Sequence, residues 1–125
     1  MSVNIVLAED EKIIALLLTK MLENRGYKVL KTFDYAEGLI EYVKNNKVDV
    51  VLMDIYLKGA TDGIEAAKVI NSFSDVMIIY VTANADPVTK ELALKTRQYG
   101  YFEKPLSDKE LLEICDIIKT NKSEI

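Results

Sequence analysis

The sequence predicts an α/β domain in which a parallel sheet is covered by helices on both faces. Short apolar, β-rich runs alternate with longer amphipathic stretches along the whole chain. Parallel strands need right-handed crossovers, which carry each connecting helix back over the sheet. The chain has 125 residues, of which 50% are hydrophobic, and this suits one core. We therefore expect a single domain over residues 1–125.

Five apolar runs are predicted to be the strands. They are Val3–Ala8, Tyr27–Phe33, Val48–Met53, Val76–Val81 and Gly100–Phe102. The third and fourth runs are almost continuously hydrophobic, as is typical of inner parallel strands that are buried on both faces. We expect these two strands to lie inside the sheet.

Helical periodicity fills the segments between the strands. The predicted helices cover 11–25, 35–46, 63–72, 87–98 and 108–120. Three of them begin at a predicted capping box, in which an N-cap oxygen and an acid three residues later satisfy free backbone amides. The pairs are Asp34 with Glu37, Asp62 with Glu65, and Ser107 with Glu110. The fourth helix is expected to start at Asp86-Pro87, a capping residue before a proline.

Composition excludes several classes of function. None of the 125 residues is histidine, so an imidazole base, a histidine metal ligand and a phosphohistidine are excluded within this sequence. The net charge of −4 argues against direct nucleic-acid binding, which needs clustered positive charge. No apolar stretch approaches the ~20 residues that span a bilayer, so we expect a cytoplasmic chain with no membrane contact. The single Cys115 is expected to be a small buried hydrophobe.

Polar residues follow the predicted strands at the point where open α/β sheets bind ligands. Glu9 and Asp10 follow the first strand, Asp54 the third, Thr82 ends the fourth, and Lys104 follows the fifth. Converging carboxylates suit a hard divalent cation, Mg²⁺ or Mn²⁺. Lysine and threonine could then hold phosphoryl oxygens. A carboxylate nucleophile beside a metal could form and break an acyl phosphate.

Four segments carry a resemblance to a known family. They are Ile5–Glu11, Val50–Asp54, Val81–Ala83 and Tyr101–Pro105. In this order and spacing the chain resembles the response-regulator receiver (CheY-like) family of two-component signalling over essentially its whole length. The resemblance implies a flavodoxin-like, doubly wound (βα)5 fold with strand order 2-1-3-4-5. It also implies a signalling phosphoprotein that catalyses only its own phosphorylation and dephosphorylation.

The resemblance assigns the phosphoacceptor and metal roles residue by residue. Asp54 matches the phosphorylated aspartate and is also expected to bind the metal. Asp10 matches the direct metal ligand, and Glu9 matches its acidic neighbour, which acts through a metal-bound water. The backbone carbonyl of Tyr56 matches the third metal ligand from the protein.

The resemblance also assigns the switch. Thr82 matches the hydroxyl that turns toward the phosphoryl oxygens, and Tyr101 matches the aromatic residue that follows it inward. Lys104 matches the lysine that pairs with the acceptor and then with the phosphate. The Lys104–Pro105 bond is expected to be cis, a geometry that proline permits.

Partners follow from the resemblance as well. The phosphodonor is expected to be a sensor histidine kinase. An unknown downstream protein is expected to bind the surface formed by the fourth helix, the fifth strand and the fifth helix. The segment Thr96–Gly100 is bulkier and more polar than the small Gly-Ala step of many receivers, so this surface is reshaped. The fifth helix has no arginine, so the ion-paired dimer of DNA-binding regulators is not expected.

Alternatives remain open at the level of the sequence. Met1-Ser2 favours a stand-alone receiver, but a receiver taken from a longer regulator or hybrid kinase would look the same. A module that keeps only the fold is disfavoured because the key positions are intact. A phosphatase of the haloacid dehalogenase type would need a second aspartate two residues after the nucleophile, where this chain has Tyr56.

The loop after Asp54 is expected to shape the lifetime of the phosphorylated state. The bulky Tyr56 side chain is expected to hinder the approach of hydrolytic water. Gly59 and Gly63 are expected to supply the backbone freedom that lets this loop bend.

Overall fold

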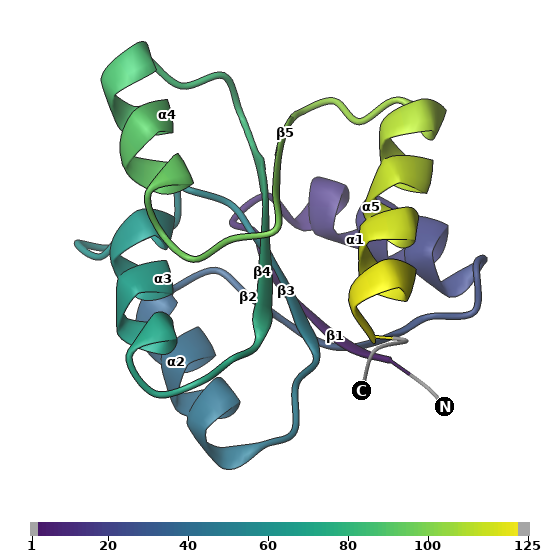
Figure 1. The fold of residues 1–125 in the computed structure, drawn as a ribbon, viewed down its shortest axis with the longest axis horizontal. Helices are drawn as coiled ribbons and strands as arrows, with labels where there is room; N and C mark the ends of the chain where they lie inside the picture. The colour runs from purple at the N-terminus through teal and green to yellow at the C-terminus, as the bar shows by residue number, and fades with distance from the viewer. Residues whose placement is uncertain (1–2, 123–125) are drawn as a thin grey trace.

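The computed structural model describes residues 3–122 as a parallel sheet with helices on both faces (Figure 1). The strands are β1 (Asn4–Ala8), β2 (Lys28–Phe33), β3 (Val50–Met53), β4 (Met77–Thr82) and β5 (Gly100–Glu103). The helices are α1 (Lys12–Glu23), α2 (Ala36–Asn45), α3 (Gly63–Asn71), α4 (Pro87–Leu94) and α5 (Asp108–Lys122). The predicted alternation of five strands and five helices is confirmed.

The sheet has the strand order β2-β1-β3-β4-β5, and every neighbouring pair is parallel. The predicted doubly wound, flavodoxin-like fold is therefore confirmed. Strands β3 and β4 are buried along their entire length, as expected for inner strands. Ala8 pairs with Met53, and Met53 pairs with Tyr80. This register brings the residues that follow β1 and β3 to the same edge as the end of β4.

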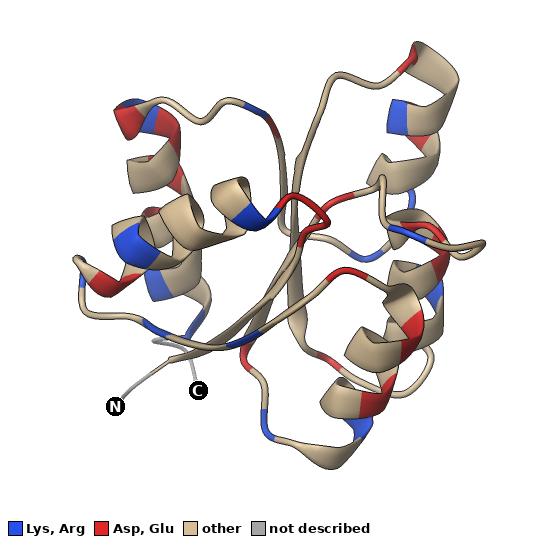
Figure 2. Cartoon of the chain, turned by 180° about the vertical axis from the view of Figure 1, so that it is seen from behind, with Lys and Arg blue, Asp and Glu red and all other residues tan. Residues whose placement is uncertain are grey.

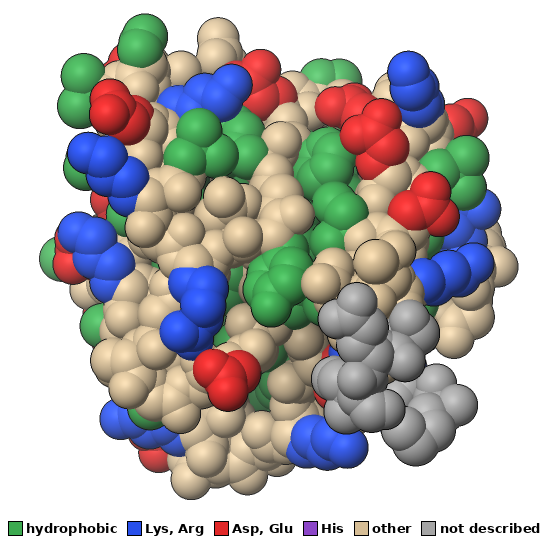
Figure 3. Space-filling view, viewed as in Figure 1, with side chains coloured by type: hydrophobic (Ala, Val, Ile, Leu, Met, Phe, Trp, Pro, Cys, Tyr) green, Lys and Arg blue, Asp and Glu red, His purple; other side chains and the backbone are tan. Residues whose placement is uncertain are grey.

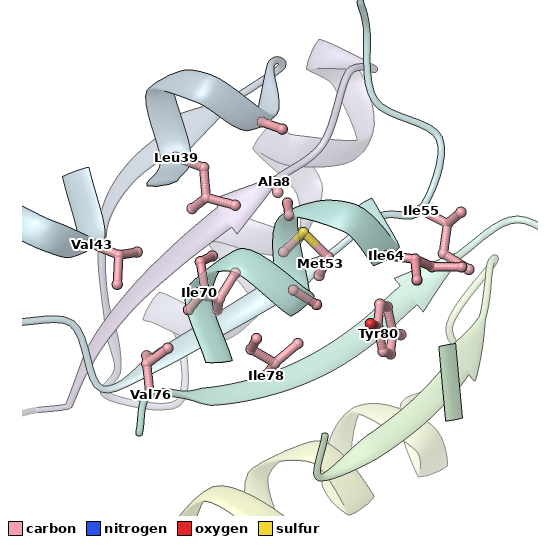
Figure 4. Close-up of a cluster of buried hydrophobic side chains, with 14 of the residues drawn as sticks. Ala8, Leu39, Val43, Met53, Ile55, Ile64, Ile70, Val76, Ile78 and Tyr80 are labelled. Atoms are coloured by element: carbon pink, nitrogen blue, oxygen red, sulfur yellow. The ribbon is translucent and has the colours of Figure 1, made fainter. Parts of the chain in front are cut away.

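The core has two halves because successive side chains of a strand point to opposite faces. On one face, Ile5 and Leu7 pack with residues of α1 and α5. On the other face, Val6 and Ala8 pack with residues of α2, α3 and α4. Figure 4 shows this second half, in which Leu39 lies near Ala8 and Ile64 lies beside Tyr80 of the sheet. The sheet edge that carries the polar residues is thus supported from both sides.

The predicted helix starts are mostly confirmed. Ser107 and Glu110 form a reciprocal capping box at α5: the Ser107 amide donates to Glu110 Oε1 at 3.0 Å and the Glu110 amide to Ser107 Oγ at 3.1 Å. Asp62 and Asp86 cap α3 and α4 by accepting from the amide three residues later, at 2.9 and 2.8 Å. Each cap satisfies an amide that the helix itself leaves free.

The capping box predicted at Asp34 is wrong. The N-cap of α2 is Tyr35, and no side-chain hydrogen bond caps the helix there. Asp34 instead binds the loop after β3: its carbonyl oxygen accepts from the Lys58 amide at 2.9 Å, and its carboxylate lies 3.5 Å from Lys58 Nζ. Asp34 therefore makes a tertiary contact with Lys58 in place of the helix cap that the local sequence pattern predicted.

Helix α4 ends at Leu94, earlier than residue 98 where periodicity predicted its end. Tertiary hydrogen bonds hold the next residues in a loop. Thr96 Oγ1 lies 2.8 Å from the Tyr80 hydroxyl, and the Arg97 amide donates to Asn71 Oδ1 at 3.0 Å. Burial raises the pKa of Tyr80 to about 12, although the hydrogen bond with Thr96 acts in the opposite direction. These contacts fasten the end of α4 to β4 and α3.

Asp49 joins the two ends of the chain at the edge opposite the polar strand ends. Its carboxylate accepts from the Asn4 amide at 2.8 Å and from Lys122 Nζ at 2.7 Å. The side chain is only 7% exposed. Burial by itself would raise the pKa of Asp49, but these two hydrogen bonds and the charges of Lys122 and Lys47 together hold the pKa below its ordinary value.

We expect Asp49→Asn to lower the free energy of unfolding by about 1–2 kcal/mol near neutral pH, because charge-assisted hydrogen bonds are lost. A carboxyl whose folded-state pKa is depressed stabilises the fold above its unfolded pKa of about 3.9, and this is lost as pH falls through the folded value. The difference between wild type and variant should therefore shrink as the solution is acidified. Urea unfolding at neutral and acidic pH measures this.

Asp75→Asn is the matched control for Asp49→Asn. Asp75 lies near the same edge and pairs with Arg97 at 3.5 Å, but its side chain is fully exposed. Exposed pairs contribute little, so a change below about 0.5 kcal/mol is expected. Equal losses in the two variants, or a difference for Asp49→Asn that grows in acid, would contradict the role of Asp49.

Candidate functional site

Three buried polar side chains meet at the carboxyl ends of the central strands. They are Glu9 after β1, Asp54 after β3 and Thr82 at the end of β4. Figure 2 shows acidic residues in the loop after β1, close to the ends of neighbouring strands. Burying carboxylates costs free energy unless they are paired or bound to a cation, so this edge is marked as a site.

Lys104, which follows β5, supplies the positive charge. Its Nζ donates to Glu9 Oε1 at 2.6 Å and to Asp54 Oδ2 at 3.1 Å. The Lys104 side chain is 11% exposed, and those of Glu9 and Asp54 are 2% and 3% exposed. Both carboxylates are thus held by one ammonium group in a place that water barely reaches. The peptide bond from Lys104 to Pro105 is cis.

The buried charges shift one another's protonation. Burial raises the pKa of Glu9, and the Asp54 carboxylate adds to this rise while the hydrogen bond from Lys104 opposes it. Burial alone would lower the pKa of Lys104, but the two carboxylates outweigh burial and raise it. Lys104 is therefore charged at neutral pH and acts as the counter-ion of the site.

Backbone amides and a hydroxyl group orient Asp54. Thr82 Oγ1 donates to Asp54 Oδ1 at 2.8 Å and accepts from the Ile55 amide at 3.2 Å. The Tyr56 amide also donates to Asp54 Oδ1, at 3.0 Å. One oxygen of Asp54 thus accepts two neutral hydrogen bonds, while the other oxygen faces the lysine.

The donor set fits a divalent cation. Glu9, Asp10 and Asp54 each offer a carboxylate oxygen, and these atoms lie within 4.8 Å of one another. Asp10 is less buried than the other two. Mg²⁺ prefers oxygen ligands and is usually held by one or two carboxylates together with water. The sequence prediction that these three residues converge agrees with this geometry.

Comparison with known proteins places this arrangement in a family. A profile of the response regulator receiver domain matches residues 5–116, nearly the whole chain. The chain belongs to the response regulator receiver domain family. It is thus a signalling receiver rather than a classical enzyme, and it carries an acidic pocket at the ends of its strands.

Two transcriptional regulatory proteins of Bacillus subtilis resemble the receiver in sequence. YvrH is 32% identical over 108 residues, which are 86% of this chain and 45% of YvrH. YrkP is 33% identical over 111 residues, which are 89% of this chain and 47% of YrkP. The receiver therefore spans about half the length of these curated relatives.

Solved structures resemble the receiver over its full length. The signal receiver domain of a modulated diguanylate cyclase from Desulfovibrio desulfuricans G20 is 31% identical, with a TM-score of 0.88 and 100% of both chains covered. The receiver domain of a sensor histidine kinase from Pseudomonas aeruginosa PAO1 is 27% identical, with a TM-score of 0.81, and covers 96% of this chain and 97% of its own. That structure has a magnesium ion coordinated in its active site cleft.

Tyr101 lies on β5 beside the site of the receiver, with its ring half-buried. The ring centroid is 6.0 Å from that of Tyr80, and Lys90 Nζ of α4 lies 5.2 Å from it. The hydroxyl is buried and has no hydrogen-bond partner among residues 3–122. Burial raises the pKa of Tyr101, and nearby Glu103 adds to this. Tyr101 thus links β4 and β5 of the sheet to α4.

The α4–β5–α5 surface of the receiver is partly apolar. Figure 3 shows apolar side chains in the hollow between α4 and α5, with charged side chains around them. The large apolar residues exposed on these elements and their connections are Val88, Leu92, Leu94, Tyr99 and Leu112. Cys115 of α5 is buried, as expected for a small hydrophobe. Within residues 3–122 no helix is long and apolar enough to cross a bilayer.

Sequence reasoning missed three features of the receiver site. It paired Lys104 with Asp54 but not with Glu9, which lies closer. It did not find the Ile55 amide, because any residue at that position carries the same donor. It assigned backbone freedom to both loop glycines, but only Gly59 has a positive φ, of 87°. Gly63 is needed for a different reason, its close approach to the Asp54 carbonyl.

Proposed function

We propose that this receiver accepts a phosphoryl group on Asp54 from a phosphohistidine of a sensor histidine kinase, in the cytoplasm. The observation that carries the proposal is the buried Asp54 carboxylate, held by Lys104 and Thr82 beside two further carboxylates. None of the 125 residues is histidine, so the phosphohistidine lies outside this sequence. In the transfer an Asp54 oxygen bonds to phosphorus as the phosphorus–nitrogen bond breaks and imidazole leaves.

The residues of the site have two proposed roles, metal binding and binding of the phosphoryl group. Asp10, Asp54 and the Tyr56 carbonyl, with Glu9 nearby, would hold Mg²⁺. The bound ion supplies positive charge that stabilises the charge of the transferred group. The Lys104 ammonium can turn from the carboxylates to a phosphoryl oxygen, and the Thr82 hydroxyl can donate to another. Both donors already lie beside Asp54, where each would turn from its present acceptor to an oxygen of the transferred group.

In this proposal, phosphorylation changes the positions of Thr82 and Tyr101, and these changes alter the α4–β5–α5 surface. The phosphoryl group biases the switch only if it binds one conformation better, and Thr82 and Lys104 provide that difference. The Tyr101 ring already lies 5.2 Å from Lys90 Nζ of α4, so its movement would change a contact with that helix. We propose that Tyr101 moves with Thr82 and alters the surface at α4, where an unknown downstream protein binds.

The test of the proposal is the binding of beryllofluoride, which mimics an acyl phosphate, with and without Mg²⁺. Saturable binding that requires Mg²⁺ and disappears when the metal is chelated is expected. Absence of binding, or binding that is unaffected by chelation, would overturn the proposal. Nuclear magnetic resonance of the residues beside Asp54 reports both outcomes.

Tyr56 is expected to set the lifetime of the phosphorylated state. Tyr56 is 44% exposed and follows Asp54 by two residues, where its side chain can hinder attacking water. Tyr56→Asn should speed the loss of phosphate several-fold, and release of labelled phosphate measures this. Tyr99→Asn is the control. Tyr99 is also exposed, but its amide donates to the Ile78 carbonyl near the start of β4, whereas the site lies at the end of that strand. An unchanged or slower decay in Tyr56→Asn would count against a shielding role.

A further inference from the structure

Gly63 lies directly against the backbone of the proposed phosphoacceptor. A Cβ atom at this position would overlap the carbonyl oxygen of Asp54 and lie 2.9 Å from both the Asp54 carbonyl carbon and Ile55 Cα. Those atoms belong to the backbone at the end of an inner strand, so they cannot turn aside as a flexible side chain would. The first residue of α3 therefore has room for a hydrogen atom but not for a methyl group.

Backbone conformation does not explain this glycine. Among the described glycines only Gly26 and Gly59 have a positive φ, of 87° in each case. Glycine is required at position 63 because it has no Cβ atom, not because of its backbone conformation. Its amide donates to the Ile55 carbonyl at 2.8 Å, and this bond closes the loop that leaves Asp54 and returns at α3.

The peptide group that Gly63 contacts also positions the side chains of the site. The amide of Ile55 belongs to the same peptide unit as the Asp54 carbonyl, and it donates to Thr82 Oγ1 at 3.2 Å. Thr82 in turn donates to Asp54 Oδ1 at 2.8 Å, and the Tyr56 amide donates to the same oxygen at 3.0 Å. A shift of this peptide would therefore move the switch hydroxyl, the acceptor and the residue whose carbonyl is the proposed metal ligand.

We propose that Gly63 is a positioning residue of the site: by lacking a side chain, it lets α3 close on the Asp54–Ile55 peptide and fixes the backbone that presents Asp54 and Tyr56 to the metal. The inference rests on the proposed function. It predicts that a methyl group at this position weakens metal binding beyond any effect on the stability of the fold.

The first test is the affinity of Gly63→Ala for Mg²⁺ alone, measured by calorimetry. We expect affinity at least about tenfold weaker than that of wild type, which equals about 1.4 kcal/mol. Asp62→Ala is the matched control, because it removes the cap of the same helix, at about 1 kcal/mol, without adding a Cβ to the contact. Gly26→Ala is a second control, since it strains the backbone where nothing lies within 4 Å of the new Cβ.

Both controls should keep the wild-type affinity for Mg²⁺ to within about twofold. Wild-type affinity in Gly63→Ala would overturn the inference. An equal loss in Asp62→Ala would also overturn it, because the integrity of α3 would then be the cause. If the wild-type protein itself fails to bind Mg²⁺, the proposed function falls first, which distinguishes the two failures.

A second measurement needs no variant and covers the case in which Gly63→Ala does not fold. If closure of the Gly63–Ile55 contact is required for metal binding, bound metal must stabilise that closure by linkage. Hydrogen exchange of the wild-type Gly63 amide should then slow at least about tenfold when Mg²⁺ is added. The Leu111 amide, in the first turn of α5, serves as the internal control. Exchange at Gly63 that Mg²⁺ leaves unchanged would overturn the inference.

Discussion

Replacement of Lys104 by methionine should lower the free energy of unfolding of the metal-free protein by about 3 kcal/mol, because breaking a buried ion pair leaves an uncompensated charge. Two carboxylates depend on this one ammonium group, Glu9 at 2.6 Å and Asp54 at 3.1 Å. Methionine is unbranched like lysine and only one atom shorter, so the loss reports charge more than packing. Urea unfolding in the presence of a chelator measures the difference.

Mg²⁺ should stabilise Lys104→Met more than it stabilises wild type, since a ligand that binds the folded state raises its stability and the variant has no competing cation. The control is Lys58→Met, which removes an exposed lysine that lies 3.5 Å from Asp34. A loss below about 0.5 kcal/mol is expected there. If Lys104→Met and Lys58→Met proved equally stable, the view of Lys104 as the counter-ion of the site would be wrong.

Removal of the Asp54 carboxylate should abolish the Mg²⁺-dependent binding of beryllofluoride. The variant loses the oxygen to which beryllium would bond and one of the proposed metal ligands. We expect Asp54→Ala to bind at least about 100-fold more weakly, or about 2.7 kcal/mol. Titration followed by nuclear magnetic resonance measures the affinity.

The loss in Asp54→Ala should not come from unfolding. Lys104 keeps its shorter bond to Glu9, so the remaining charges form one buried pair. Asp34→Ala is the matched control, because Asp34 follows β2 at the same edge but has its ion pair with Lys58. Binding of beryllofluoride should be unchanged there. Persistent binding in folded Asp54→Ala would remove Asp54 from the acceptor role.

The positions of the site residues could be predicted because the residues that follow parallel strands lie at one edge of the sheet, and the resemblance supplied the order of the strands. Hydrophobic runs located β1, β3 and β4, and a parallel sheet gathers the residues after such strands at one edge. Glu9 and Asp54 could therefore be placed together before any side-chain geometry was available. The pairing of Lys104 with Glu9 could not, because it depends on side-chain reach across the sheet.

The errors of sequence reasoning all lie where tertiary contacts replace local patterns. Periodicity carried α4 beyond Leu94, but Thr96 and Arg97 form hydrogen bonds with β4 and α3 instead. A capping pattern was assigned to Asp34, which binds Lys58 across a loop. Gly63 was assigned backbone freedom, whereas its role is the close approach to Asp54. These contacts join residues that are well separated in the sequence, so no local sequence pattern predicts them.

The most direct test of the central claim is to locate the phosphoryl group after incubation with a small acyl phosphate, Mg²⁺ and the wild-type protein. The account predicts one added phosphoryl group per chain, labile to hydroxylamine, absent when Mg²⁺ is chelated, and mapped to Asp54 by reduction and peptide mass analysis. A phosphoryl group on a serine, threonine or tyrosine, or an acyl phosphate at another carboxylate, would contradict it.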